Sequence, residues 1–328
     1  MIKSIAIIAG EPNSISSEII FKSWHLRKKY PHKPFFIIGS INLLNLQKKK
    51  LNYTFEIKKI EKNFTINDLK TNNLPVYDIN YKQKKPFMSL SSKSNNYIFK
   101  CFDAASKFAE NKKILGFVNC PVAKEFLFQK KHQGITEYLS NKYNKKGKEV
   151  MLIYNKNLSV CPITTHIPLK LVSSKIKKHN IVEKVKVINN FYIKMLNKKP
   201  NFAILGLNPH NFSSLKKSIE KEIISEAISK LLKFKIRVSG PIPTDSSFMA
   251  SNKRKYDVIV GMYHDQVLTP FKALYNYDAI NITLGLPYIR ISPDHGVGVN
   301  LIGKNKANPK SLIESLKFFN HLKKNENN

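Results

Sequence analysis

The stretch YDVIVGMYHDQVLTPFK, residues 256–272, sets an apolar run directly before a group of polar side chains. The run at 258–260 is β-branched throughout, and such a short run is typical of a strand buried inside a sheet. In open α/β sheets, ligands bind in the crevice outside the carboxyl ends of the strands. We therefore predict a buried strand at 258–260 that carries His264 to such an edge.

Short apolar runs alternate with longer helical patterns along the rest of the chain, which is typical of a mostly parallel α/β sheet. Strands are predicted at 4–9, 35–38, 53–57, 76–78, 114–118, 150–154, 202–205, 237–239, 258–260 and 279–283, and helices at 17–29, 97–110, 169–178, 181–196, 219–232 and 309–322. A new series of elements begins near residue 134. We therefore predict a first α/β domain formed by residues 1–130 with roughly 300–328, and a second formed by roughly 131–299.

The composition restricts the class of protein. The formal net charge of +34 comes almost entirely from lysine spread over the chain, because the only arginines are Arg27, Arg237, Arg254 and Arg290. Arginine is the better reader of phosphates and bases, so its scarcity argues against a nucleic-acid partner. The three cysteines lack metal-type spacing, and no segment approaches 18 continuous apolar residues. We expect a soluble, cytoplasmic protein with no membrane partner.

Three of the nine histidines follow apolar runs: His166 in CPITTHIPLK, His210 in FAILGLNPHNF and His264 in VIVGMYHDQ. Three imidazoles at strand ends could hold a divalent metal with open positions for substrate, which is the ligand count of a catalytic site. A lone histidine at a strand end is more often part of the hydrogen-bonded framework, and the long spacings carry no motif. The pattern alone leaves a metal site and structural histidines equally open.

Several ordered segments resemble those of the 4-hydroxythreonine-4-phosphate dehydrogenase family of pyridoxal phosphate biosynthesis. They are TTHIPL (164–169), LGLNPH (205–210), GPIPTDSSF (240–248), MYHDQVLTPFK (262–272) and INITLGLPYIRISPDHGVG (280–298), with NCPVAKE (119–125), GITEYL (134–139) and GKNKANPKSLIESL (303–316). The resemblance spans essentially the whole chain. It implies a two-domain αβα sandwich with mostly parallel sheets, like isocitrate and isopropylmalate dehydrogenases, with the active site in the cleft between the domains.

The resemblance also implies a metal and a dimer. His166, His210 and His264 match histidines that bind a divalent metal, Zn, Mg or Co, with the third contributed across the interface of a homodimer that shares its active site. Asp265 could orient an imidazole or accept a proton. Asp245, in PTDSSF, is a candidate for the same roles. An aspartate after a histidine is also common in turns and helix caps, so the acid-base role and the structural role both stay open.

The family's substrate-binding positions match Thr136, Lys272, Asn281 and Arg290. These side chains suit an anionic substrate, because lysine is a point charge, arginine a bidentate fork and asparagine a neutral donor and acceptor. The implied reaction is oxidation of the secondary alcohol of 4-phosphooxy-L-threonine by NAD or NADP, followed by decarboxylation to 3-amino-2-oxopropyl phosphate. The implied partner is therefore a small phosphorylated substrate, and a structural ion pair is the alternative role of Arg290.

Three segments differ from the family pattern, and one of them is AGEPNSISSE (9–18), which lacks the interior glycines of the family's early turn. Ile135 stands where the family has a histidine, and residues 211–216 lack the glycines with which the family approaches the dinucleotide. Side chains restrict the approach of backbone amides to phosphate, so we assign the cofactor only to the region of Asn211, Lys216 and Lys217. The alternatives are a dehydrogenase of a related phosphorylated hydroxy acid, such as a threonate phosphate, and a metal- and phosphate-binding homologue without dehydrogenase activity.

Overall fold

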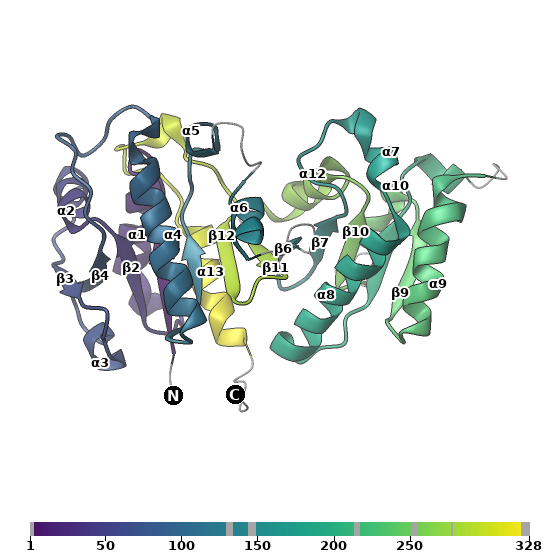
Figure 1. The fold of residues 1–328 in the computed structure, drawn as a ribbon, viewed down its shortest axis with the longest axis horizontal. Helices are drawn as coiled ribbons and strands as arrows, with labels where there is room; N and C mark the ends of the chain where they lie inside the picture. The colour runs from purple at the N-terminus through teal and green to yellow at the C-terminus, as the bar shows by residue number, and fades with distance from the viewer. Residues whose placement is uncertain are drawn as a thin grey trace. The chain divides into compact units, whose positions relative to one another are not determined.

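The computed structural model describes residues 3–128, 134–143, 149–212, 217–250, 255–276 and 278–322, and the chain divides into two compact units (Figure 1). Unit 1 contains Met1–Tyr138 and Leu286–His321, and unit 2 is built on Leu139–Gly285. Residues 286–299, which we predicted in the second domain, are grouped with unit 1, where strand β12 (Ile289–Pro293) pairs with strand β5 (Ile114–Asn119). None of the helices in the described ranges is long and apolar enough to cross a membrane.

The sheet of unit 1 is parallel. Its strand order is β3 (Ile57–Ile60), β4 (Leu74–Asp78), β2 (Phe35–Gly39), β1 (Ser4–Ile8), β5 and β12. Every residue of β1 and β2 is buried, which is the pattern of central strands with both faces covered. Helix α4 (Asn95–Glu110) packs on β1, β2 and β5, and α13 (Lys310–His321) packs on β5 and β12. The other helices that begin in this unit are α1 (Ser16–His25), α2 (Ile41–Lys50), α3 (Ile66–Leu69), α5 (Lys124–Phe128) and α6 (Ile135–Lys142).

The sheet of unit 2 combines parallel and antiparallel pairs. Its order is β11 (Ile280–Leu284), β6 (Val150–Tyr154), β7 (Ser159–Pro162), β10 (Val258–Gly261), β8 (Phe202–Leu205) and β9 (Val238–Ile242). Strands β7, β10, β8 and β9 are parallel, whereas β6 runs antiparallel to β7 and β11. Its helices are α7 (Val172–Lys175), α8 (Lys178–Leu196), α9 (Glu226–Lys233), α10 (Thr244–Ser247) and α12 (His264–Tyr275). Ile259 of β10 and Val267 and Phe271 of α12 share one buried apolar cluster, which holds the strand and the following helix together.

The predicted mostly parallel α/β fold is confirmed, but several elements had no predicted counterpart. These are β7, β12, α2, α3, α5, α6, α10 and α12. Pro162 and Pro293 end the two short strands and Pro270 lies inside α12, so three of these patterns carry a residue that disfavours the element. Strand β3 begins where the predicted strand 53–57 ends, and the predicted helix 169–178 is divided between a 3₁₀ turn, α7 and the start of α8.

Candidate active site

The predicted site residues fall into two sets, one in each unit. Thr136 and Arg290 lie in unit 1. The others lie in unit 2: His166, His210, Asn211, Lys217, Asp245, His264, Asp265, Lys272 and Asn281. Lys216 lies outside the described residues. We call the first set, with its neighbours Asn119, Lys124 and Glu137, the arginine cluster, and the three histidines with Asp265 the histidine set.

Strand β12 places Arg290 inside unit 1. Arg290 pairs with Phe117 of β5, and only 4% of its surface is exposed. The two strands approach closely because Gly116 has no side chain, and a Cβ there would collide with the carbonyl oxygen of Ile289. Burying a guanidinium is costly unless its N–H groups are hydrogen-bonded, so its neighbours decide what it can do.

Two neutral acceptors hold the Arg290 guanidinium. Its Nε donates to Oδ1 of Asn119 at 2.6 Å, and its Nη1 donates to Oγ1 of Thr136 at 3.2 Å. Asn119 is buried at the carboxyl end of β5, and its Nδ2 donates to the carbonyl oxygen of Cys120 at 3.1 Å, which orients the carboxamide. Thr136 and Arg290 were predicted from the sequence, but Asn119 was not. The sequence feature that could have indicated Asn119 is its position at the end of an apolar run.

Charged groups around Arg290 shift one another's pKa. Burial lowers the pKa of Arg290 to about 10, and the charge of Glu137 acts in the opposite direction. Desolvation also lowers the pKa of Lys124, with Glu137 opposing this effect and the charge of Arg290 adding to it. The Lys124 side chain is nevertheless exposed in part, so solvent screens some of this repulsion. Two cations with one carboxylate leave a net positive charge, which suits the cluster to a small anion.

Two of the three predicted metal ligands lie side by side in unit 2. His264 is the first residue of α12, His166 follows β7, and their ring centroids are 5.9 Å apart. Nδ1 of His264 lies 2.7 Å from Oδ1 of Asp265, so this carboxylate can orient the ring and leave Nε2 for a metal. His166 is exposed and His264 partly exposed, which leaves both rings accessible to an ion from solvent.

His210 is not grouped with this pair. It follows β8 in a 3₁₀ turn, and its φ of 50° and the φ of 58° at Asn211 are both left-handed. Residues other than glycine adopt this conformation at a cost that surrounding contacts must offset. In the described part of the chain, no three His, Cys, Asp or Glu side chains are arranged to hold a metal. His166 and His264 therefore fit two positions of a metal site whose third ligand is not assembled with them.

The other predicted residues of unit 2 lie on separate elements. Lys272 is exposed on α12, about two turns after His264. Asn281 lies on β11, and its buried Oδ1 has no hydrogen-bond partner among the described residues, so it can accept one from a ligand. Asp245 is exposed in α10 and accepts a hydrogen bond from the backbone nitrogen of Ser246 at 2.9 Å. Each of these residues therefore presents a polar or charged group that suits a polar substrate.

Gln266, which was not among the predicted residues, connects three strand-end segments of unit 2. Its side chain is buried, and its Oε1 accepts a hydrogen bond from the backbone nitrogen of Met262 at 2.6 Å. Its Nε2 donates to the carbonyl oxygen of Gly206 at 2.7 Å and to Oγ1 of Thr244 at 2.8 Å. The segments lead to three predicted site residues: His264, His210 and Asp245. The polar run after β10 therefore also serves to hold neighbouring loops at one end of the sheet.

The predicted cofactor region is described at Asn211 and Lys217. Nδ2 of Asn211 donates to the carbonyl oxygen of Pro241 at 2.9 Å, and its Oδ1 fills the space that a Cβ on Gly206 would need. The Asn211 side chain thus helps to hold the loop, while Lys217 is exposed. The assignment of the cofactor to this region stays a prediction.

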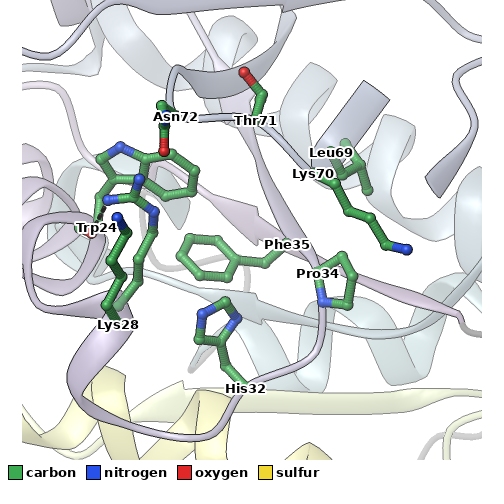
Figure 2. A pocket seen from close by; sticks show the side chains of 10 residues that line it. Trp24, Lys28, His32, Pro34, Phe35, Leu69, Lys70, Thr71 and Asn72 are labelled. Atoms are coloured by element: carbon green, nitrogen blue, oxygen red, sulfur yellow. Dashed lines mark hydrogen bonds between the residues drawn. The ribbon is translucent and has the colours of Figure 1, made fainter. Parts of the chain in front are cut away.

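A pocket of about 350 Å³ in unit 1 has none of the predicted site residues in its lining. Figure 2 shows this lining, which comes from the end of α1 and the segments before β2 and β4. The guanidinium of Arg27 lies 3.9 Å from the ring centroid of Trp24 and donates to the Trp24 carbonyl oxygen at 2.9 Å, which gives this arginine a structural role. The pocket lies at the amino ends of the parallel strands, opposite to the edge where α/β sheets bind ligands, so we do not assign the active site to it.

Comparison with known proteins connects these features to one family. The family model described as pyridoxal phosphate biosynthetic protein PdxA matches residues 31–319. The chain is 37% identical over 326 residues to 4-hydroxythreonine-4-phosphate dehydrogenase of Sulfurihydrogenibium sp. (strain YO3AOP1), with 98% of each chain covered. It is 34% identical to the protein of that name from Aquifex aeolicus (strain VF5), covering 98% of this chain and 99% of the relative. The crystal structure of 4-hydroxythreonine-4-phosphate dehydrogenase from Klebsiella pneumoniae matches with a TM-score of 0.84 and 27% identity, covering 97% of this chain and 99% of that chain. The resemblance seen in the sequence is thereby confirmed, and the chain belongs to the PdxA family.

Proposed function

We propose that this protein is a cytoplasmic, metal-dependent NAD(P) dehydrogenase of pyridoxal phosphate biosynthesis. It oxidises the secondary alcohol of 4-phosphooxy-L-threonine and releases carbon dioxide, which gives 3-amino-2-oxopropyl phosphate. The observation that carries the proposal is the arginine cluster, in which a buried Arg290 is held by neutral acceptors beside Lys124. The relatives' name, 4-hydroxythreonine-4-phosphate dehydrogenase, includes a phosphorylated compound, and such a compound needs cationic partners.

The residues that match the family's substrate-binding positions bind and orient the substrate in this proposal. Arg290 offers a planar guanidinium to an anionic group, and Thr136 fixes one of its nitrogens. Lys272 supplies a point charge, and Oδ1 of Asn281 accepts a hydrogen bond from a substrate hydroxyl or ammonium group. Alignment of this kind lowers the entropic part of the barrier before any bond breaks.

The histidine set and Asp245 serve the chemistry of the alcohol in this proposal. His166 and His264 would hold the divalent metal, with His210 as the third ligand, and when bound the ion supplies Lewis-acid chemistry to the alcohol and to the ketone that follows. Asp265 keeps the His264 ring oriented through Nδ1. The exposed carboxylates Asp245 and Asp265 are the candidates to accept the hydroxyl proton. The region of Asn211, Lys216 and Lys217 would hold the nicotinamide cofactor, which would supply the hydride acceptor for this oxidation.

A homodimer with a shared active site is part of the proposal. In the described part of one chain, the three histidines do not form a three-ligand group. A histidine from a second copy would complete the ligand set, and the symmetry of a dimer would produce two equivalent sites.

Turnover tests the proposed function. The protein with a divalent metal, NAD or NADP and 4-phosphooxy-L-threonine should produce the reduced cofactor, and parallel reactions with a threonate phosphate measure the related-substrate alternative. Arg290→Lys should raise the KM for the phosphorylated substrate roughly ten- to a hundredfold, because a point charge does not replace the forked guanidinium. Arg237→Lys, at an exposed arginine, is the matched control and should change the KM little. Phosphate binding without reduction of either cofactor would favour a homologue that lacks dehydrogenase activity.

A further inference from the structure

Glu220 is a buried carboxylate outside the predicted site. It is 1% exposed and begins a π-helical turn, Glu220–Ser225, that leads into α9. Its Oε1 accepts hydrogen bonds from the backbone nitrogens of Leu207 and Asn208 at 3.1 and 2.9 Å, and from Nδ2 of Asn208 at 3.1 Å. Burying a charge is costly, and charge-assisted hydrogen bonds of this kind offset the cost. The Glu220 carboxylate therefore holds the segment that follows β8 through these hydrogen bonds.

That segment leads directly to His210. After Asn208 and Pro209, the backbone of His210 and Asn211 turns left-handed, with φ of 50° and 58°. The backbone nitrogen of Asn211 donates to the carbonyl oxygen of Asn208 at 3.2 Å, which closes the turn. Two successive non-glycine residues in this region persist only where the surroundings determine the backbone strongly. Glu220 supplies this restraint just ahead of the strained residues.

Neutral contacts hold the same segment at two other points. Nε2 of Gln266 donates to the carbonyl oxygen of Gly206, and Nδ2 of Asn211 donates to the carbonyl oxygen of Pro241. Glu220 adds a charged partner to this network, and it does so from a π-helical turn, a local irregularity that is frequent at functional sites. The segment 206–211 is thus held both ahead of its left-handed turn and at Asn211 within it.

We propose that Glu220 is a positioning residue whose carboxylate fixes the turn at 207–211, so that the His210 imidazole is presented to the divalent metal. The consequence for the metal rests on the proposed function, whereas the contacts with the turn do not. Contacts behind a metal ligand set its orientation, and their loss typically reduces metal affinity about 10- to 100-fold.

Glu220→Gln tests this role, with Glu222→Gln as the charge-matched control, because Glu222 is exposed on the same π-helical turn. Glutamine keeps the shape but offers a neutral acceptor oxygen and an NH₂ group that cannot accept from the loop. We expect amide hydrogen exchange at Leu207 and Asn208 to accelerate by about tenfold or more, since hydrogen bonds to a charged group are among the stronger ones. The affinity of the metal-free protein for Co²⁺ or Zn²⁺ should fall roughly tenfold, with the control unchanged.

The two readouts separate this inference from the proposed function. Exchange and metal affinity equal to those of the Glu222→Gln control would overturn the role of Glu220, and so would faster exchange with unchanged metal affinity. Faster exchange with weaker metal binding, in a wild type that binds metal but does not turn over the substrate, would support the role and reject the function. If Glu220→Gln does not fold, Glu220→Asp is measured in the same way, and it should show a smaller change in the same direction; no change would overturn the role.

Discussion

The arginine cluster and the histidine set arrange their polar groups in opposite ways. Arg290 is 4% exposed, and its partners Asn119 and Thr136 come from its own unit. The histidine set lies closer to solvent, and it brings His166 and His264 together without a third metal ligand from the described ranges of the chain. Folding alone thus positions the guanidinium, whereas in the proposed metal site a bound ion or a second chain would complete the arrangement of the imidazoles.

The largest effect is expected at the histidine set. His166→Ala, His210→Ala and His264→Ala should each abolish metal-dependent turnover while the protein stays folded, because none of the three rings is buried in the core. Metal content and circular dichroism of each variant check this. Full metal content in any one of them would remove that histidine from the ligand set.

Mixing the inactive variants sharpens the comparison, because it asks which chain supplies each ligand. If His264 is contributed by a second chain, heterodimers of His166→Ala and His264→Ala chains should regain roughly a quarter of the wild-type activity in a random mixture. The alternative is that His166 and His264 bind the metal from the same chain, in which their rings lie side by side. If both act in the same chain, this mixture stays inactive and a mixture of His166→Ala with His210→Ala regains activity instead.

A smaller effect is expected at the arginine cluster from Asn119→Asp. Aspartate keeps an acceptor for Nε of Arg290 but adds a second carboxylate beside Glu137, which reduces the positive charge offered to an anion. The KM for the phosphorylated substrate and the inhibition constant of inorganic phosphate should both rise about tenfold, with a smaller change in kcat. Asn72→Asp adds the same charge at an exposed position of unit 1 and is the control. Equal kinetics in the two variants would show that Asn119 does not act through Arg290.

The sequence predicted the fold well because its signals are local. The residues of a run such as 258–260 are all apolar, which by itself indicates a buried strand. The alternation of such runs with helical patterns indicates an α/β sheet. Strands β7 and β12 were missed because each is short and ends in proline. Whether such a segment joins the sheet depends on its pairing with distant strands. Arg290 stood out because arginine is rare in this chain.

Asn119, Glu220 and Gln266 were missed for a related reason. Asn119 meets Arg290 across 171 residues, and Gln266 meets Gly206 across 60. Nothing in the local pattern marks a polar residue whose role is to hold another segment, since the same residue types also occur on solvated surfaces. Residues that present a charge to a ligand were therefore easier to predict than residues that position them.

The smallest effect is expected from Lys217, because its charge is exposed whereas that of Arg290 is buried. Attraction between an exposed lysine and a cofactor phosphate is screened over roughly 8–10 Å at physiological ionic strength, whereas a buried charge is screened much less. Lys217→Ala should therefore raise the KM for the nicotinamide cofactor a few-fold at low salt, and the difference should vanish as salt is added. The exposed Lys230 of α9 supplies the control variant, Lys230→Ala. The KM for the phosphorylated substrate should depend less on salt in all three proteins, because the buried Arg290 carries part of that interaction. Equal salt dependence of the two KM values would contradict this contrast, and a cofactor KM that does not respond to Lys217→Ala would move the dinucleotide away from residues 211–217.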